Sequence, residues 1–346
     1  MNLKQLSQTL GLSQTTVSRA LNGYPEVSEA TRRRVHAAAI AHNYRPNTRA
    51  KGLATGRAMA IGHVIPIATK HEMVNPVFAD FIAGAGEAYS NAGYDMHLSV
   101  VKDADEERIY CDLASKRNVD GVIVHAPLIN DPRIKLLREI GLPFVVHGRS
   151  SGEEGPYSWL DINNRRAFSR ATGFLLDLGH RRIGLINGLE HMDFAQRRRD
   201  GYTSALDKRG IAADPALMVS EEMTETNGYR SALNMLEQDT PPTAFLVSSI
   251  ISAIGVRRAI EELGLKMGKD VSLIVHDDEL SYFKNSDGMD VPLFTATRSS
   301  VRDAGRQAAE MLLSIIQSPD TAPQSRLLEA ELTLGRSTCP APQEAK

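Results

Sequence analysis

The chain has 346 residues, of which 42% are hydrophobic, and its 40 basic side chains are nearly balanced by 42 acidic ones. That length can hold one large domain or two to three ordinary domains with a sizeable core. A charged fraction of 24%, the lack of any apolar run near the roughly 20 residues of a membrane-spanning helix, and only two cysteines exclude disordered, membrane and disulfide-rich classes and favour a cytoplasmic protein.

Positive charge is concentrated at the N-terminus. Residues 1–57 contain nine Lys or Arg and two acidic residues, so they carry +7 while the rest of the chain carries −9. A small basic segment attached to an acidic body is typical of proteins that bind a polyanion such as nucleic acid. Charge alone fits a solvated basic face equally well, so the local pattern must decide.

Two short helices are predicted at the N-terminus. The first, Leu3–Leu10, follows Asn2 as a candidate N-cap and ends at Gly11. Ser13 is placed to cap the second, Gln14–Leu21. Two short helices joined by a glycine-containing turn indicate a helix-turn-helix, whose second helix enters the DNA major groove.

A third helix begins after Ser28 and ends before Tyr44 and Pro46. Its expected apolar stripe consists of Val35, Ala38, Ala39 and Ile40. The outer face of the second helix presents side chains that suit base edges or phosphates, namely Gln14, Thr15, Ser18 and Arg19.

These residues resemble the DNA-binding head and hinge of the LacI/GalR family of bacterial transcription regulators, in the runs LSQTTVSRALNGYPEVSEATRRRV and NYRPNTRAKGLATGR. The resemblance implies a DNA-binding domain over residues 1–46. Within it, bases would be read by Gln14, Thr15 and Arg19. Phosphates would be held by Ser13, Ser18, Asn22 and Thr31. The junction with the hinge would be secured by Tyr44 and Asn47.

The hinge is expected over residues 47–57. Its helical part, 48–54, is too short to be stable alone, because about two turns do not recover the cost of helix nucleation. The resemblance implies that it becomes helical only on operator DNA, where Leu53 would wedge into the minor groove.

From residue 58 onward, short apolar runs alternate with amphipathic stretches. Strands are predicted over 60–67, 96–101, 121–127, 143–148, 159–162, 182–188, 243–249 and 271–277. Helices are predicted over 79–92, 166–178, 197–209, 227–237, 251–263 and 301–316. This alternation implies parallel sheets covered by helices, and so many strands favour two lobes.

The resemblance continues to about residue 336, in LDLGHRRIGLING, FAQRRRDGY and DVSLIVHDD. It implies two Rossmann-like lobes of the periplasmic-binding-protein type, following the small all-α helix-turn-helix head. The effector-binding and dimerisation domain would span 58–336. Its lobes would cover about 60–162 and 163–290, with 291–336 crossing between them and 337–346 forming a flexible tail.

Polar residues that end predicted strands are the candidates for an effector site, since ligands of open α/β sheets lie at the carboxyl ends of strands. They are His125, His147, Arg149, Asn163, His276 and Asp277. The resemblance adds Arg198 as an effector contact and Met223 at the ring-stacking position. It also marks a departure, because relatives usually have Asp where this chain has Ile250.

Enzyme and metal functions are set aside. The GRSSG run at 148–152 matches a nucleophile elbow but lacks the helix that must follow it. The acids at 277–279 have no second cluster to complete a metal site, and no cofactor is expected.

We therefore expect a homodimeric, nucleoid-associated transcription regulator, a repressor, that binds a near-palindromic operator and a small carbohydrate effector, without membrane association. Three alternatives stay open. The effector could be a non-sugar metabolite such as a nucleobase, the regulator could be insensitive to ligand because of Ile250, and the effector could either release or promote DNA binding.

Overall fold

The computed structural model describes residues 1–21, 23–44, 56–66, 75–102, 105–286, 288 and 290–342. The chain divides into two units, Met1–Met59 and Ala60–Lys346. Three of the predicted DNA contacts, Asn22, Asn47 and Leu53, lie outside the described residues, as does most of the expected hinge.

The first unit is a helical head whose elements are α1 (Leu3–Leu10), α2 (Gln14–Leu21) and α3 (Glu29–Ala41). Both caps predicted for α1 are present. The Asn2 side chain accepts a hydrogen bond from the Gln5 amide, and Gly11 takes the left-handed conformation with φ of 63°. A compact core joins the helices through the buried side chains of Leu6, Leu10, Val17, Ala20, Val27, Val35 and Ala39.

The prediction that Ile40 belongs to the core of the head is wrong. Ile40 is 82% exposed, whereas Val35 and Ala39 are buried. The reason is helical periodicity, because Ala39 stands four residues from Val35 and shares its face, while Ile40, five residues away, is rotated out of it.

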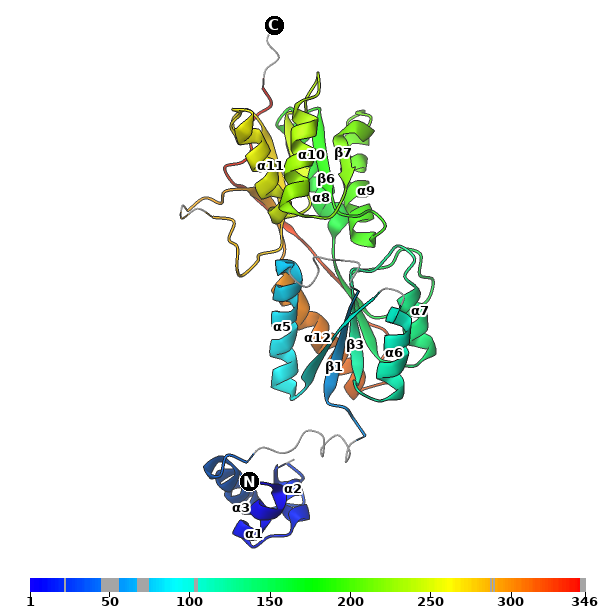
Figure 1. The fold of residues 1–346 in the computed structure, drawn as a ribbon, viewed down its shortest axis with the longest axis vertical. Coiled ribbons are helices and arrows are strands. Elements are labelled where there is room, and N and C mark those ends of the chain that lie inside the picture. Colours follow the sequence, from blue (N-terminus) through cyan, green and yellow to red (C-terminus); the bar gives the residue numbers. More distant parts are fainter. Residues whose placement is uncertain are drawn as a thin grey trace. The chain divides into compact units, whose positions relative to one another are not determined.

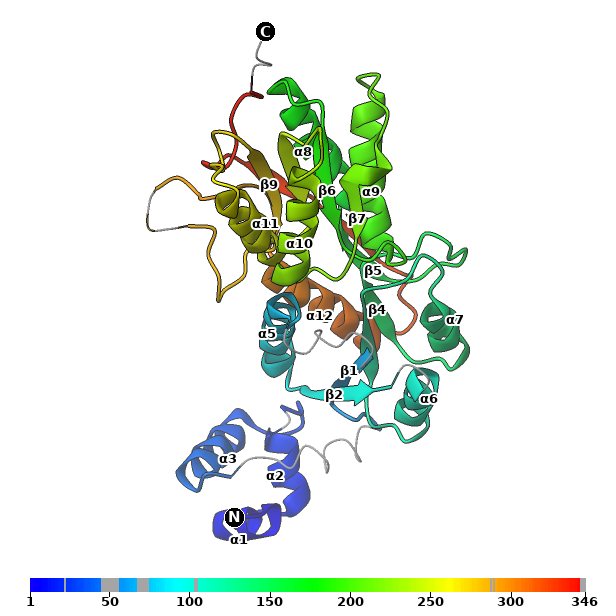
Figure 2. The ribbon, with the colours of Figure 1, turned by 45° about the horizontal axis from the view of Figure 1, so that its top comes forward.

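The second unit contains two α/β lobes, each built on a mostly parallel sheet (Figures 1 and 2). The six-stranded sheet of lobe 1 has the order β11-β5-β4-β3-β1-β2. Its strands are β1 (Ala60–Pro66), β2 (Asp95–Val101), β3 (Gly121–His125), β4 (Phe144–His147), β5 (Trp159–Ile162) and β11 (Ser325–Leu328). Its helices are α5 (Pro76–Ala92), α6 (Glu106–Ser115), α7 (Pro132–Glu139) and α12 (Val301–Gln317). Figure 1 shows α5 and α12 on one side of this sheet and α6 and α7 on the other.

The six-stranded sheet of lobe 2 has the order β12-β10-β9-β8-β6-β7, in which only β12 runs antiparallel to its neighbour. Its strands are β6 (Ile183–Asn187), β7 (Met218–Ser220), β8 (Ala244–Val247), β9 (Ser272–Asp277), β10 (Thr295–Arg298) and β12 (Glu331–Thr333). Its helices are α8 (Asn164–Asp177), α9 (Asp193–Asp207), α10 (Glu225–Leu236) and α11 (Ile250–Glu262), with the short 3-10 helix η3 (Pro215–Leu217).

The α5–α12 pair shows how closely helices pack in this fold. A Cβ on Gly84 would stand 1.9 Å from the Arg302 carbonyl oxygen, and one on Gly305 would stand 2.1 Å from that of Phe81. Only glycine permits this backbone approach. It joins α12, which is late in the sequence, to the first helix of lobe 1.

The chain passes between the lobes three times, between β5 and α8, between β10 and α12, and between β11 and β12. Two of these segments are tied together, since the Asn163 amide nitrogen donates to the Leu328 carbonyl at 2.8 Å. The connections bring both sheets to the same gap, with the carboxyl ends of their parallel strands facing it.

Residues 337–341, within the tail predicted to be flexible, form hydrogen bonds with lobe 2. Ser337 is fully buried, and its hydroxyl accepts from the Thr295 amide at 2.8 Å and donates to the Leu273 carbonyl. The Cys339 amide donates to the Ser272 hydroxyl at 2.9 Å, and the Ala341 amide donates to the Leu178 carbonyl. Hydrogen bonds therefore attach the STCPAP run to lobe 2. Such bonds leave no periodic pattern in the sequence from which they could be predicted.

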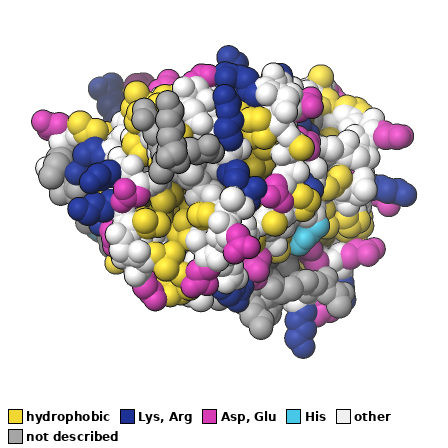
Figure 3. Space-filling view, turned by 90° about the horizontal axis from the view of Figure 1, so that it is seen from above, with side chains coloured by type: hydrophobic (Ala, Val, Ile, Leu, Met, Phe, Trp, Pro, Cys, Tyr) yellow, Lys and Arg dark blue, Asp and Glu magenta, His cyan; other side chains and the backbone are white. Residues whose placement is uncertain are grey.

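Basic, acidic and apolar side chains are interspersed on the face shown in Figure 3. Within the described ranges, no helix is both long and apolar enough to cross a membrane.

Candidate functional site

The head presents a groove next to α2. Four of the predicted DNA contacts line it, namely Ser13, Thr15, Arg19 and Thr31. Gln14 is also exposed, on the adjoining first turn of α2. Local capping orders this surface, because the Ser13 hydroxyl accepts from the Thr16 amide at 3.0 Å and starts the helix.

Two further predicted contacts of the head are less exposed. Ser18 is half-buried, and Tyr44 packs against the head core, where burial raises the pKa of its hydroxyl. Tyr44 is thus held by the core at the end of the head, directly before the residues expected to form the hinge.

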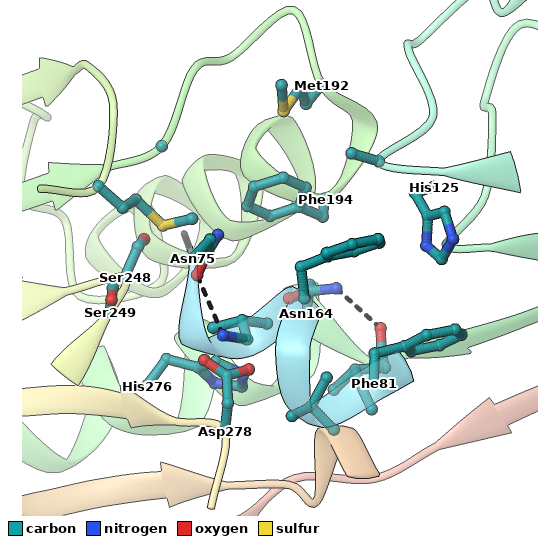
Figure 4. Close-up of a pocket in the computed structure, with 18 of the residues that line it drawn as sticks. Asn75, Phe81, His125, Asn164, Met192, Phe194, Ser248, Ser249, His276 and Asp278 are labelled. Atoms are coloured by element: carbon teal, nitrogen blue, oxygen red, sulfur yellow. Dashed lines mark hydrogen bonds and ion pairs between the residues drawn. The ribbon is translucent and has the colours of Figure 1, made fainter. Parts of the chain in front are cut away.

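The second unit contains a cavity of about 360 Å³ between the two sheets. Its wall is made by strand ends and helix starts of both lobes, including the residues where the chain crosses between them. Figure 4 shows Ser248, Ser249 and Asp278 on one side and Phe81 and His125 on the other. The volume falls in the range of about 300–1,000 Å³ that is common for small-molecule sites.

Arg198, on α9, organises the wall from lobe 2. Its Nε donates to Oδ1 of Asn164 at 2.7 Å, and a terminal nitrogen donates to the Ser248 carbonyl at 2.7 Å. The guanidinium also lies over the rings of Phe168 and Phe194, at 5.1 and 4.9 Å from their centroids. Burial lowers the pKa of Arg198 to about 10, opposed by Asp278 and Asp161, so the side chain stays charged at neutral pH.

Asp161 lies at the end of β5, where the chain leaves lobe 1. Its Oδ2 accepts from Nε of Arg149 at 2.7 Å, and its Oδ1 accepts from Nδ2 of Asn164 at 3.4 Å. Burial raises the pKa of this carboxyl, although Arg149 opposes the rise. Arg149, which does not line the cavity itself, therefore neutralises a carboxylate of the cavity wall.

Asp278 follows β9 and faces the cavity together with His276. The described contact of its carboxylate is with Nε2 of His276, at 3.4 Å. Burial opposes its ionisation, but His276, Arg198 and His147 hold its pKa below the usual value. Asp278 is consequently an ionised acceptor with room for a ligand hydroxyl.

Lobe 1 contributes an aromatic wall. The ring of Phe81 stacks on His147 with centroids 4.2 Å apart and meets His125 edge-on at 5.0 Å. Phe78 also meets His125 edge-on, at 5.1 Å. Burial lowers the pKa of His147 to about 4 and that of His125 well below its usual range, so both rings are neutral at pH 7.

Hydrogen bonds join the lobes on both sides of the cavity. On one side, the buried Asp193 of α9 accepts from the Ser151 amide at 2.7 Å and from the Ser151 hydroxyl, while Arg197 donates to that hydroxyl at 2.9 Å. On the other side, the two oxygens of Asp80 accept from the Ser281 amide and hydroxyl at 2.7 and 2.6 Å. The two lobes are therefore in direct contact on both sides of the cavity.

Several sequence-predicted effector residues line this cavity: His125, His147, Arg198, Met223 and His276. Four others do not: Arg149, Asn163, Ile250 and Asp277. Arg149 is occupied by Asp161, as described above.

At each of the other three predicted positions, the next residue in the sequence lines the cavity instead. Asn163 uses its Oδ1 to cap α8, accepting from the Arg166 amide at 3.3 Å, and its Nδ2 donates to Glu329, so Asn164 faces the cavity instead. Ile250 is fully buried in lobe 2, and Ile251 lines the cavity. Asp277 accepts from the Glu279 amide at 2.9 Å.

Alternation along strands gives the reason for the displacement at β9. Successive side chains point to opposite faces, so His276 and Asp278 share one face and Asp277 takes the other. The sequence prediction also missed Asp161, Ser248 and the phenylalanines. The preference of Ser249 and Asn163 for N-cap positions is the signal that could have directed attention to their neighbours.

A metal centre finds no support in the part of the chain that the structure describes, where no group of three or more His, Cys, Asp or Glu side chains is arranged to hold an ion.

Comparison with known proteins gives consistent matches. Residues 3–47 match the model described as bacterial regulatory proteins, lacI family, and residues 172–338 match a periplasmic binding protein-like domain. The chain is 46% identical over 345 residues to the HTH-type transcriptional regulator AglR of Rhizobium meliloti (strain 1021), covering 100% of this chain and 96% of that protein.

Two solved structures are similar over nearly the whole chain. A transcriptional regulator CelR–cellobiose complex gives a TM-score of 0.72 at 27% identity, covering 97% of this chain and 99% of that one. The lac repressor dimer bound to operator and the anti-inducer ONPF gives a TM-score of 0.80 at 25% identity, covering 98% and 99%.

Proposed function

This chain belongs to the LacI family of bacterial regulatory proteins and is a DNA-binding transcription regulator, and we propose that it represses transcription as a homodimer under the control of a carbohydrate held in the cavity between its lobes. The α2 surface would contact operator DNA in the cytoplasm, and the cavity would bind the effector rather than catalyse a reaction.

The cavity carries the proposal of a carbohydrate effector. A sugar needs paired donors and acceptors for its hydroxyls and an apolar surface for its ring face. Arg198, Asn164 and Asp278 offer the polar groups, while Phe81 and Phe194 offer ring faces. The structurally similar CelR was solved with cellobiose, which supports the same ligand class here.

Asp278 also bears on the unusual Ile250. A carboxylate beside Arg198 can accept from ligand hydroxyls, so the loss of the acidic residue expected at position 250 leaves an acceptor in the cavity. We therefore propose that the regulator responds to its effector.

The homodimer proposal rests on a similar protein and on an exposed sheet edge. The lac repressor structure is a dimer. Strand β2 lies at the edge of the lobe 1 sheet, with Leu98 and Val100 exposed by 41% and 47%. An apolar edge strand in a monomer promotes association. Light scattering of wild type and of Val100→Lys would test whether this edge joins two copies, since the charged variant should be monomeric.

The deciding experiment is selection of the full-length protein on random duplex DNA near physiological salt, with and without maltose, cellobiose and a mixed sugar pool. We expect a symmetric site with two half-sites, enriched to different extents with and without sugar. Enrichment that no sugar changes would contradict the carbohydrate proposal, and no enrichment in any condition would contradict operator binding.

Arg19→Ala tests the head directly. Arg19 is exposed in the α2 groove, where it would form a base contact. The substitution should weaken operator binding by about 1–3 kcal/mol and relax sequence preference at one base pair in each half-site. Binding assays on single-base operator variants measure this, with Lys4→Ala as a basic-residue control. Equal weakening on every sequence would indicate a phosphate contact instead.

A planar heterocycle is the second candidate effector, because Phe81 and Phe194 could stack on a base as well as on a sugar ring. Thermal-shift measurements with nucleosides and nucleobases beside the same sugars would test this candidate. Stabilisation by a nucleobase alone would favour this candidate.

A further inference from the structure

A buried hydrogen-bond chain leads from the core of lobe 1 to the cavity wall. The Tyr89 hydroxyl lies 3.1 Å from Nε2 of His63, and Nδ1 of His63 lies 2.9 Å from Nε2 of His125. Tyr89 and His63 are 1% and 0% exposed, whereas His125 lines the cavity. Only the last of the three residues can therefore touch an effector.

All three groups are neutral near pH 7. Burial lowers the pKa of His63 to about 3 and that of His125 well below its usual range, with His63, His147 and Arg133 adding to the effect on His125. Burial also raises the pKa of Tyr89. Each imidazole then carries one N–H, so the chain of hydrogen bonds has two possible directions.

In the first direction, Tyr89 donates its O–H to Nε2 of His63, and Nδ1–H of His63 donates to Nε2 of His125. The remaining N–H of His125 is then on Nδ1. In the second direction, Nε2–H of His125 donates to His63, and Nε2–H of His63 donates to the Tyr89 oxygen. Nδ1 of His125 would then carry only a lone pair.

The tyrosine decides between these directions. Reversal leaves the Tyr89 hydroxyl hydrogen without an acceptor, because the hydrogen bond described for this hydroxyl is the one to His63. A buried donor left unsatisfied is disfavoured roughly tenfold to a hundredfold. The first direction should therefore dominate, against the preference of a free neutral histidine for Nε2–H.

No hydrogen bond joins Nδ1 of His125 to another described residue. Its ring is bounded by the edges and faces of Phe78, Phe81 and His147, and Arg133 contacts only its backbone carbonyl, at 3.0 Å. The cavity is thus where the Nδ1–H can find a partner.

We infer that Tyr89 and His63 are positioning residues that fix His125 as a hydrogen-bond donor, so that the effector must place an acceptor oxygen at the carboxyl end of β3. This inference rests on the proposed function only in taking the cavity as the effector site. Across the cavity, Asp278 accepts hydrogen bonds and therefore needs a hydroxyl donor. Lobe 1 would thus bind an acceptor group of the ligand, and lobe 2 would bind a donor group.

The first test needs no ligand. Long-range ¹H–¹⁵N spectra of the full-length protein labelled at its ten histidines report which ring nitrogen of each is protonated, and a His125→Gln variant assigns the signal. We expect Nδ1–H on His125 in wild type and loss of this single tautomer in Tyr89→Phe. Nε2–H on wild-type His125, or an unchanged tautomer in Tyr89→Phe, would overturn the inference.

The second test measures ligand binding, with maltose and cellobiose as probes. Tyr89→Phe should weaken binding of the sugar that binds wild type by roughly tenfold. Tyr202→Phe is the matched control, because Tyr202 is 1% exposed, its hydroxyl donates to the Ile183 carbonyl at 2.7 Å, and it does not line the cavity. Equal losses in the two variants would reject a positioning role. If neither sugar binds wild type, the mixed sugar pool of the selection experiment decides the carbohydrate proposal, and the histidine spectra decide the tautomer.

Discussion

The two walls of the cavity differ in how they present polar groups. Lobe 2 supplies Arg198, Asn164 and Asp278, whose charges and hydrogen bonds are linked to one another. Lobe 1 supplies neutral imidazoles between phenylalanine rings, and its Asp161 carboxylate is already paired with Arg149. The difference indicates a division of labour, in which lobe 2 orients a ligand through charged groups, while lobe 1 covers its apolar faces and offers the N–H of His125.

Acid should have the largest effect, through the buried histidines of lobe 1. His63 and His147 have folded pKa values of about 3 and about 4, below the value near 6.5 expected after unfolding. The unfolded chain therefore binds more protons between these limits. The free energy of unfolding should be highest above pH 6.5 and fall as the pH is lowered, by up to about 1.4 kcal/mol per unit for each buried histidine.

Urea unfolding at several pH values measures this slope. His63→Gln should flatten it, whereas His191→Gln, at an exposed position, should leave it unchanged. A wild-type stability that does not vary between pH 7 and 5 would mean that the histidines of lobe 1 are not held neutral.

Arg198→Ala should have the next largest effect, because it removes the group that holds Asn164 and the Ser248 carbonyl in place. Losing charged, buried hydrogen bonds should weaken effector binding by about a hundredfold or more while operator binding persists. Calorimetry and DNA anisotropy measure the two properties. Arg199→Ala, which breaks only a partly exposed pair with Glu190, is the control. A preserved effector response in Arg198→Ala would assign ligand orientation elsewhere.

Phe81→Leu tests the lobe 1 wall with little change in volume. Its ring contacts both His147 and His125, so losing the aromatic face should weaken sugar binding by about five- to tenfold. Leu137→Met, in the lobe 1 core away from the cavity, controls for repacking. An effect as large as that of Arg198→Ala would contradict the division between the walls.

Ser151→Ala should have the smallest effect. It removes the hydroxyl shared by Asp193 and Arg197 across the lobes. If effector binds to the arrangement in which these lobe contacts are made, loss of the hydroxyl should reduce affinity about threefold to tenfold. Ser115→Ala, on the surface of α6, is the control. Unchanged affinity would mean that this contact does not favour closure.

The sequence predicted the head more fully than the cavity, because caps and helical periodicity act within a few residues. Asn2, Gly11 and Ser13 mark the ends of α1 and α2 where the structure has them. The fold class and most strands of the two lobes also follow from the sequence, since buried parallel strands leave apolar runs.

What could not be predicted depends on pairing between distant segments. Strand β11 has only four residues and is mostly exposed, and it is a strand because β5 lies beside it. Helices α6 and α7 are short and carry many charged side chains, so their apolar signal is weak. In the cavity, single-residue shifts such as Asp277 to Asp278 decide which side chain faces a ligand, and these require the strand alternation to be placed correctly.

The three passages of the chain between the lobes have a consequence for synthesis on the ribosome. Lobe 1 lacks α12 and its edge strand β11 until after all of β6 to β10 has been made, and lobe 2 then still awaits β12 and Ser337. The head needs only residues near its own α1 to α3. A nascent chain can therefore fold its DNA-binding part long before the part that regulates it, while the unfinished sheets stay exposed to aggregation and to chaperones.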